Sequence, residues 1–243
     1  MATYHTITYT HMVEGTAKSI PIKYFVASND EISVYGVRDG ISGSAANNSN
    51  IYGVNGTFFQ LNSHQVYGVA VNNGNPVNVD YFNNYGGSNN HPDLDCFLFG
   101  IDTPISGSSI FLSNQNSFPF VADNTTITMG DAKWAIGGHN LHLHVNFSSS
   151  SAFYNSLSSG VSVYGPENNN SRTFVGCTPN GNLYICSVTS EQCNLYDEYK
   201  FLKHMGCTLG LNLDGGGSAF ISHKNGYSAN SSRAVPTVLR VNY

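Results

Sequence analysis

The chain is poor in charged residues. Asp, Glu, Lys and Arg make up 10% of its 243 residues, and the formal net charge is −5. A helical bundle needs far more charge on its outer faces, so the composition argues against an all-helical protein. A basic cluster is also absent, which argues against nucleic acid as a partner. Gly, Asn, Ser and Tyr are abundant instead, as is typical of a protein built from strands and turns.

Long apolar runs are missing as well. No segment is long enough to cross a bilayer, so we expect no membrane partner. Residues 1–6 lack the basic start and the apolar core of a secretion signal. These absences favour a cytoplasmic or virion-associated protein; export by another route, or a signal that this chain lacks, are the alternatives. The oligomeric state stays open.

The cysteines are few and scattered. There are five, with no C-x-x-C pair, which argues against a structural zinc site. Cys177 and Cys186 flank a turn at residues 179–182, where we expect Cys177 to pair with Tyr184. That register sets the two cysteines one diagonal step apart, which argues against a disulfide. We expect reduced, mostly buried thiols.

Three histidines lie close together in the sequence: His139, His142 and His144. We expect a strand at residues 141–145, which places His142 and His144 on one face. No acidic residue follows at a spacing that would complete a metal site. We therefore expect neither a metal nor another cofactor.

Short β-prone segments separated by turn residues run through most of the chain. They predict a single α+β domain over residues 1–243, made mainly of antiparallel strands in a twisted sheet or sheets, with a few packed helices. The clearest hairpin joins residues 172–176 to residues 183–188. The Asn-Asn-Gly-Asn sequence at 72–75 predicts a second hairpin.

One helix is predicted near the C-terminal third of the chain. Thr189 can cap its start with Gln192 as reciprocal partner, and Gly206 marks its end. Four apolar side chains between them repeat at helical spacing: Leu195, Tyr199, Leu202 and Met205. A strand follows at residue 207, so we expect the helix to pack on the sheet that contains this strand.

This strand, at residues 207–214, ends in an acid and a run of glycines. Its apolar side chains occupy the odd positions, so Asn212 and Asp214 share the opposite face. The following turn offers bare N–H groups and one hydroxyl: Gly215, Gly216, Gly217 and Ser218. Two interpretations are open, a pocket for a polar ligand or a tight Asp-Gly hairpin. We favour the pocket, because a plain hairpin needs one glycine rather than three.

Three more polar residues are candidates for a site. Arg172 opens the strand of the clearest hairpin, and Arg233 precedes an Ala-Val-Pro segment. A guanidinium binds phosphate or carboxylate through paired N–H groups, and a surface salt bridge is the alternative for either arginine. Asn55, followed by Gly56, interrupts an apolar segment, and a buried Asn must find partners in the protein or in a ligand.

Together these segments resemble the phosphodiester glycosidase family. The resemblance covers most of the chain after about residue 20 and rests on five segments in family order: Asn55-Gly56-Thr57-Phe58-Phe59, Ala135-Ile136-Gly137-Gly138, Arg172-Thr173 with its hairpin, Asn212 to Ser218, and Arg233-Ala234-Val235-Pro236. The segment from Asn212 to Ser218 is the most specific. Thr57 replaces a family glycine and could narrow the pocket, and an Asn/Gly-rich loop at 83–90 could overhang the site and change the choice of substrate.

The resemblance implies cleavage of a sugar-1-phosphodiester at the anomeric carbon, which releases free sugar and a phosphomonoester. It places Asp214 against the anomeric centre as nucleophile, base or stabiliser of the oxocarbenium ion. It places Arg172 and Arg233 on the phosphate, where they stabilise the charge that grows on departure. The groups expected to hold the substrate are Asn55, Gly56, Asn212, Gly215, Gly216, Gly217 and Ser218.

Two alternatives are kept. The first is a glycan-binding module that has the pocket without catalysis, which abundant Tyr and Asn would suit. The retention of Asp214 with both arginines argues against it, because binding alone does not require them. The second is a phage or bacterial enzyme that acts on another anomeric phosphodiester, from a wall polymer or a nucleotide-derived signal.

Overall fold

The computed structural model describes residues 1–77, 96–115, 117–157 and 165–243. Within these ranges most residues belong to antiparallel strands, and three helices are short. The strands are β1 (Thr3–Val13), β2 (Thr16–Ala27), β3 (Ile32–Ile41), β4 (Gly53–Asn55), β5 (Ala70–Asn72), β6 (Asn75–Pro76), β7 (Cys96–Ile105), β8 (Ser108–Ser113), β9 (Phe120–Ala122), β10 (Thr125–Ile127), β11 (Ala132–Asn140), β12 (Asn170–Cys177), β13 (Leu183–Cys193), β14 (Leu209–Asn212), β15 (Phe220–His223), β16 (Gly226–Ala229) and β17 (Val235–Val241). The helices are α1 (Gly43–Asn48), α2 (Ser150–Tyr154) and α3 (Leu195–His204), with 3-10 turns η1 (Asn29–Glu31), η3 (Met129–Asp131) and η5 (Gly216–Ser218).

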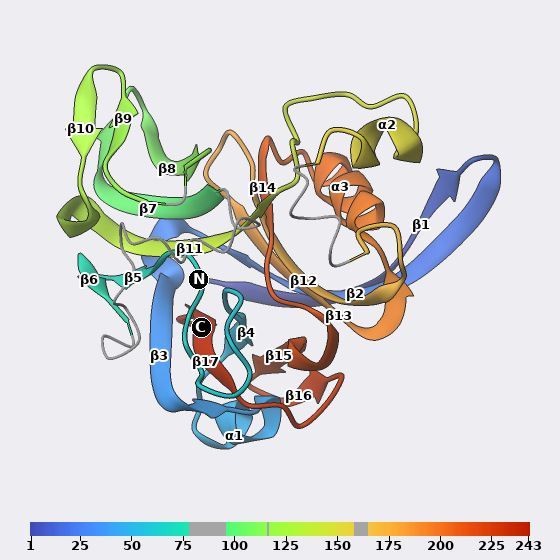
Figure 1. Ribbon diagram of the computed structural model, residues 1–243, viewed down its shortest axis with the longest axis horizontal. Coiled ribbons are helices and arrows are strands. Elements are labelled where there is room, and N and C mark those ends of the chain that lie inside the picture. Colours follow the sequence, from blue (N-terminus) through green and yellow to red (C-terminus); the bar gives the residue numbers. More distant parts are fainter. Residues whose placement is uncertain (78–95, 116, 158–164) are drawn as a thin grey trace.

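Two sheets form the body of the molecule (Figure 1). A curled sheet of ten strands runs in the order β1-β2-β13-β12-β14-β11-β5-β6, with β7 paired to β11 and β8 paired to β7. A second sheet has the order β16-β15-β4-β17-β3, and β9 and β10 form a separate pair. The α+β class, with mainly antiparallel strands and few helices in a single domain, is therefore confirmed. The boundaries of that domain stay a prediction.

The main core lies between the two sheets. Ile185 and Leu211 reach it from the curled sheet, and Val54 and Leu239 reach it from the smaller sheet. All four side chains are fully buried. Because strand side chains alternate, the even-numbered residues of β14 point to the other face of the curled sheet, where the polar site lies.

Both chain ends are anchored on the same residue. The amino group of Met1 lies 2.9 Å from Glu31 Oε1, and the backbone N–H of Asn242 donates to the carbonyl of Glu31 at 2.7 Å. Figure 1 shows the two termini beside each other near the middle of the molecule. None of the described helices is long and apolar enough to span a membrane.

Both predicted hairpins are present. Asn72 pairs with Asn75 across a two-residue turn, and the turn residues Asn73 and Gly74 both have positive φ, as a type I′ turn requires. In the β12–β13 hairpin Cys177 pairs with Leu183, so the expected pairing with Tyr184 is wrong by one residue. All five cysteines are free and buried, as predicted.

The helix α3 begins later than predicted. Residues 189–193 continue β13, and Asn194 rather than Thr189 is the N-cap. The side chain of Asn194 accepts from the N–H of Asp197 at 3.0 Å, and Asp197 Oδ2 accepts from the N–H of Asn194 at 2.7 Å. This reciprocal pair is stronger than a Thr–Gln box because one partner is charged. As expected, α3 packs on β13 and β14.

Several strands and one turn differ from the prediction, and β9, β15, β16 and β17 are among the strands that were not predicted. The strand β1 was not predicted, and β11 was identified only by its glycine motif. Glycine is needed there, because a Cβ on Gly138 would lie 2.2 Å from the carbonyl oxygen of Asn212. The expected strand at 141–145 is wrong: His142 has φ +50°, and its carbonyl accepts from the N–H of Val145 at 2.9 Å, which makes a turn. The loop at 83–90 lies outside the described residues.

Candidate active site

The site begins where β14 ends. Asp214 follows the strand, and the chain then enters η5 and continues into β15. Since β14 and β15 belong to different sheets, the Asp-Gly hairpin is excluded. A Cβ on Gly215 would lie 2.7 Å from the carbonyl oxygen of Ser171, so glycine lets the turn pack tightly against β12.

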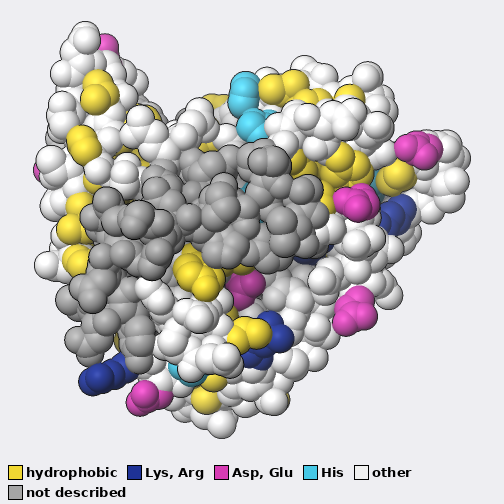
Figure 2. Space-filling model, in the orientation of Figure 1, with side chains coloured by type: hydrophobic (Ala, Val, Ile, Leu, Met, Phe, Trp, Pro, Cys, Tyr) yellow, Lys and Arg dark blue, Asp and Glu magenta, His cyan; other side chains and the backbone are white. Residues whose placement is uncertain are grey.

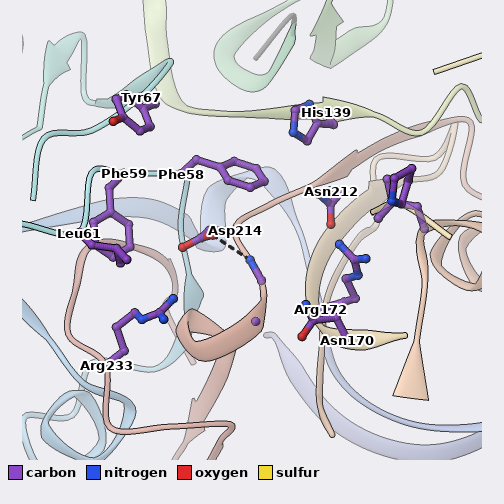
Figure 3. A pocket seen from close by; sticks show the side chains of 14 residues that line it. Phe58, Phe59, Leu61, Tyr67, His139, Asn170, Arg172, Asn212, Asp214 and Arg233 are labelled. Atoms are coloured by element: carbon purple, nitrogen blue, oxygen red, sulfur yellow. Dashed lines mark hydrogen bonds between the residues drawn. The ribbon is translucent and has the colours of Figure 1, made fainter. Parts of the chain in front are cut away.

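A cavity of about 310 Å³ opens beside this turn (Figure 3). It brings together six predicted residues: Asn212, Asp214, Gly215, Gly216, Arg172 and Arg233. Eight others complete the described lining: Phe58, Phe59, Leu61, Tyr67, His139, Pro166, Asn170 and Leu195. Asp214 is the only acid among them. The remaining predicted residues, Asn55, Gly56, Gly217 and Ser218, are not part of this lining.

Asn55 lies behind the cavity and is fully buried. Its Nδ2 donates to the carbonyl of Asp214 at 2.6 Å. Its Oδ1 accepts from Thr173 Oγ1 at 2.6 Å and from the N–H of Phe220 at 3.1 Å. These contacts tie the backbone of Asp214 to both sheets, so the geometry indicates a positioning role.

Gly56 and Ser218 also form hydrogen bonds with neighbouring residues. The N–H of Gly56 donates to the carbonyl of Thr237 at 2.8 Å, and its carbonyl accepts from the N–H of Asp214 at 3.3 Å. The hydroxyl of Ser218 is a hydrogen-bond partner of Asp214 and accepts from Arg233 Nη1 at 3.3 Å. Ser218 therefore links the acid to the arginine.

Burial raises the pKa of Asp214 from its ordinary 3.8 to about 6. Hydrogen bonds from Ser218 and from the N–H of Gly215, together with the charge of Arg233, act in the opposite direction. The N–H of Gly215 donates to Oδ1 at 3.0 Å. A carboxyl that titrates near neutrality changes its protonation easily under working conditions, as groups in acid–base catalysis must.

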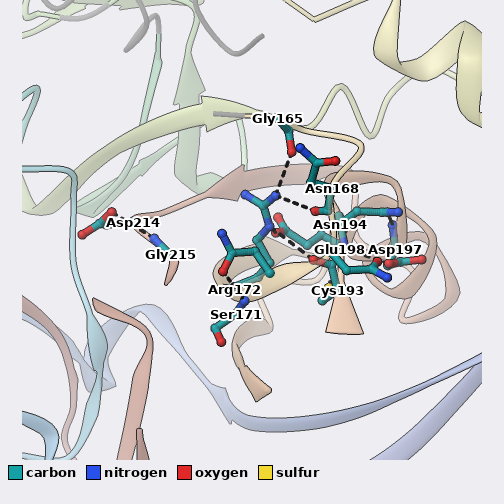
Figure 4. Close-up of polar contacts among 12 residues, drawn as sticks. Gly165, Asn168, Ser171, Arg172, Cys193, Asn194, Asp197, Glu198, Asp214 and Gly215 are labelled. Carbon is teal, nitrogen blue, oxygen red and sulfur yellow. Dashed lines mark hydrogen bonds and ion pairs between the residues drawn. The ribbon is translucent and has the colours of Figure 1, made fainter. Parts of the chain in front are cut away.

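Arg172 is almost fully buried, so the interpretation as a surface salt bridge is wrong for this residue. Figure 4 shows its guanidinium among backbone carbonyls. Nε donates to Cys193 O at 3.4 Å, and Nη2 donates to Gly165 O at 3.3 Å and to Asn168 O at 3.1 Å. Much of its donor capacity is therefore used to hold the 165–168 segment at the edge of the cavity.

A buried acid lies behind Arg172. Glu198, in the first turn of α3, is 0% exposed, and its Oε1 lies 3.9 Å from Arg172 Nε. Burial raises the pKa of Glu198 well above its usual range, while Arg172 acts against this rise and Asp197 adds to it. This partner of Arg172 was not predicted. The only indication of Glu198 in the sequence is an acidic residue near the start of a helix, next to the apolar face of that helix.

Arg233 differs from Arg172 in its surroundings. It is exposed, and its Nη1 donates to Ser218 Oγ at 3.3 Å. Its guanidinium lies over the glycine turn, since a Cβ on Gly217 would be 2.8 Å from its Cζ. Arg233 is therefore better placed than Arg172 to give paired donors to an anionic ligand.

One wall of the cavity is apolar, and it was not predicted. Phe58 and Phe59 end the Asn55-Gly56-Thr57-Phe58-Phe59 segment, so this motif itself contained the signal. Thr57, expected to narrow the pocket, is buried, and its hydroxyl donates to the carbonyl of Tyr67 at 2.9 Å. It therefore braces the loop rather than lining the cavity.

The histidines do not act as a group. His139 belongs to β11, pairs in register with Asn212 and lines the cavity. His142 and His144 lie in the turn that follows, with ring centroids 6.0 Å apart. Among the residues that the structure describes, no three His, Cys, Asp or Glu side chains are grouped so as to hold a metal.

The chain matches a family model and shares its fold with solved structures. Residues 48–242 match the family model described as phosphodiester glycosidase. The fold is similar to the zebrafish N-acetylglucosamine-1-phosphodiester alpha-N-acetylglucosaminidase catalytic domain, auto-inhibited by its pro-peptide, with a TM-score of 0.74 and 15% identity over 100% of this chain and 83% of that one.

Two further solved structures share the fold at a TM-score of 0.56. A hypothetical protein from Synechocystis is 11% identical over 97% of this chain and 61% of its own. A putative exported protein from Burkholderia pseudomallei is 12% identical over 92% of this chain and 74% of its own. No curated protein matches the sequence. On the strength of the model that covers residues 48–242, the chain belongs to the phosphodiester glycosidase family.

Proposed function

We propose that this protein hydrolyses the glycosidic bond of a sugar-1-phosphodiester and releases free sugar and a phosphomonoester. One observation carries the proposal: the carboxylate of Asp214 and the exposed guanidinium of Arg233 line the same cavity, in a chain with only 10% charged residues. A phosphodiester is anionic, and the anomeric centre becomes cationic during cleavage. The cavity provides a positive charge for the phosphate and a negative charge for the anomeric centre.

The reaction needs little acid catalysis. The bond from C1 to the bridging oxygen breaks, its electron pair stays with the phosphate, and the oxygen of water becomes bonded to C1. A phosphomonoester is a good leaving group, so one carboxylate can serve where most glycosidases use two. Asp214, as nucleophile, base or stabiliser of the oxocarbenium ion, acts on the sugar side, and Arg233 stabilises the phosphate as it departs.

The proposal is tested with a panel of sugar-1-phosphate methyl esters that includes the N-acetylglucosamine ester, because the zebrafish enzyme of similar fold is named for that sugar. Release of free sugar and methyl phosphate, followed by chromatography, is the expected result. Binding of an ester without release would favour the glycan-binding module. Neither binding nor release from any ester would contradict the proposal.

The pH dependence follows from the pKa of Asp214, which burial raises to about 6. The carboxylate form is the one that can act as nucleophile, base or charge stabiliser. We therefore expect kcat/KM to be level above pH 6 and to fall about tenfold per pH unit well below it. The measurement is kcat/KM from pH 4.5 to 8.5. An activity that instead falls above pH 6 would assign catalysis to the protonated acid.

A further inference from the structure

We propose that the phosphodiesters this site prefers carry an apolar group, alkyl in character, on the far side of the phosphate from the sugar. This inference rests on the proposed function and names the substrate class within it. It comes from the unequal chemistry of the two halves of the cavity, which Figure 3 shows on either side of Asp214.

One half of the cavity is rich in polar side chains. His139 and Asn212 are register partners on neighbouring strands, so their side chains share a face. The Oδ1 of Asn212 is buried and has no hydrogen-bond partner among the residues that the structure describes. Asn170 and Arg172 line the same side. A buried acceptor without a partner is costly, and a sugar hydroxyl would satisfy it. The sugar ring belongs in this half.

The other half is formed by the loop between β4 and β5. Backbone bonds close this loop, from the N–H of Gln60 to Gln65 O and from the N–H of Tyr67 to Phe58 O, both at 2.8 Å. The loop presents four apolar or aromatic lining side chains, Phe58, Phe59, Leu61 and Tyr67, of which Phe58 is in ring contact with His139 at 5.0 Å. Apart from the hydroxyl of Tyr67, these side chains have no group that can form a hydrogen bond with a polyol. Leu61 is 58% exposed, so a ligand could still bury much of it.

Arg233 connects the phosphate to this wall. Gly40 lies between the chain that follows Arg233 and the loop. A Cβ on Gly40 would be 2.9 Å from Ala234 Cβ and 3.2 Å from Nε2 of the loop residue His64. His64 is in turn in ring contact with Phe59 at 5.8 Å. A phosphate held by Arg233, with its sugar against Asn212, therefore directs its second ester group toward Phe59 and Leu61.

Figure 2 shows hydrophobic, acidic and Lys or Arg side chains close together near the centre of this face. Burial of each methylene of a ligand changes its binding constant about fourfold. Contact of an alkyl chain with this wall is thus large enough to select substrates.

The test compares three diesters of the sugar that reacts fastest in the methyl panel: the methyl, n-hexyl and glyceryl esters. Their leaving phosphates differ little in acidity, so differences in rate report contacts. We expect kcat/KM for the hexyl ester to exceed that for the glyceryl ester by about tenfold, since partial burial of two methylenes already suffices. Leu61→Asn should reduce the hexyl-to-glyceryl ratio toward one.

A matched control is available in Met12 on β1, which is also 58% exposed but lies outside the cavity lining. Met12→Asn should leave the hexyl-to-glyceryl ratio as it is. Equal kcat/KM values for all three esters, or a preference for the glyceryl ester, would overturn the inference while leaving the proposed function intact. Absence of free sugar from every ester would overturn both.

Discussion

Asp214→Asn should lower kcat on the preferred methyl ester by about 10³-fold. The amide keeps the size of the side chain, and its oxygen can still accept from the N–H of Gly215, which now donates to Asp214 Oδ1 at 3.0 Å. What it loses is negative charge next to C1 and the ability to take up a proton. The measurement is single-turnover and steady-state hydrolysis at pH 7.5.

This variant should fold. The pKa of Asp214 is raised to about 6 by burial, so its contribution to stability is fully present below pH 4 and is lost as the pH rises through 6. An uncharged amide avoids that loss, and Asp214→Asn should melt no lower than the parent at pH 8. Asp30→Asn, at a side chain 82% exposed, is the matched control and should keep full activity. Near-normal activity of Asp214→Asn would remove Asp214 from the mechanism.

Arg233→Ala should reduce kcat/KM by about 10²-fold to 10³-fold and leave stability within about 0.5 kcal/mol. The exposed guanidinium makes a single 3.3 Å bond, to Ser218, so little structure depends on it. The account assigns it mainly to the charge that develops on the departing phosphate. The measurement is kcat/KM with the methyl ester, together with urea unfolding.

Arg172→Ala, unlike Arg233→Ala, should destabilise the protein. It removes three bonds to backbone carbonyls and the ion-pair partner of the fully buried Glu198. We expect it to lower the free energy of unfolding by about 3 kcal/mol. Equal stability losses in the two variants, or normal turnover in Arg233→Ala, would contradict the division of roles between the arginines.

Local patterns predicted much of this protein. The alternation from residue 207 to residue 214 correctly put Leu211 and Leu213 in the core and Asn212 and Asp214 on the opposite face. A few local residues also determine the geometry of the Asn72–Asn75 turn and of the 172–188 hairpin. Such features need only near neighbours, so sequence spacing is sufficient to find them.

Contacts between distant segments could not be predicted. Glu198 faces Arg172 because α3 packs against β12 and β13, and nothing near either residue indicates the other. The buried bond of Asn55 to Thr173 likewise joins strands of different sheets, and its bond to Phe220 joins residues 165 positions apart in the sequence. The start of α3 was missed because β13 pairing extends to Cys193, a tertiary effect that overrode the local capping signal of Thr189.

The position of bond cleavage tests the central claim most directly. Hydrolysis of the methyl ester in ¹⁸O-labelled water gives the same two products whether C1–O or P–O breaks, and mass spectrometry shows which product carries the label. With Asp214 acting at the anomeric carbon, we predict methyl phosphate without ¹⁸O; this product is the diagnostic one, because the anomeric oxygen of a free sugar exchanges with water. Label in methyl phosphate would mean attack at phosphorus, and the assignment of Asp214 to the sugar would be wrong.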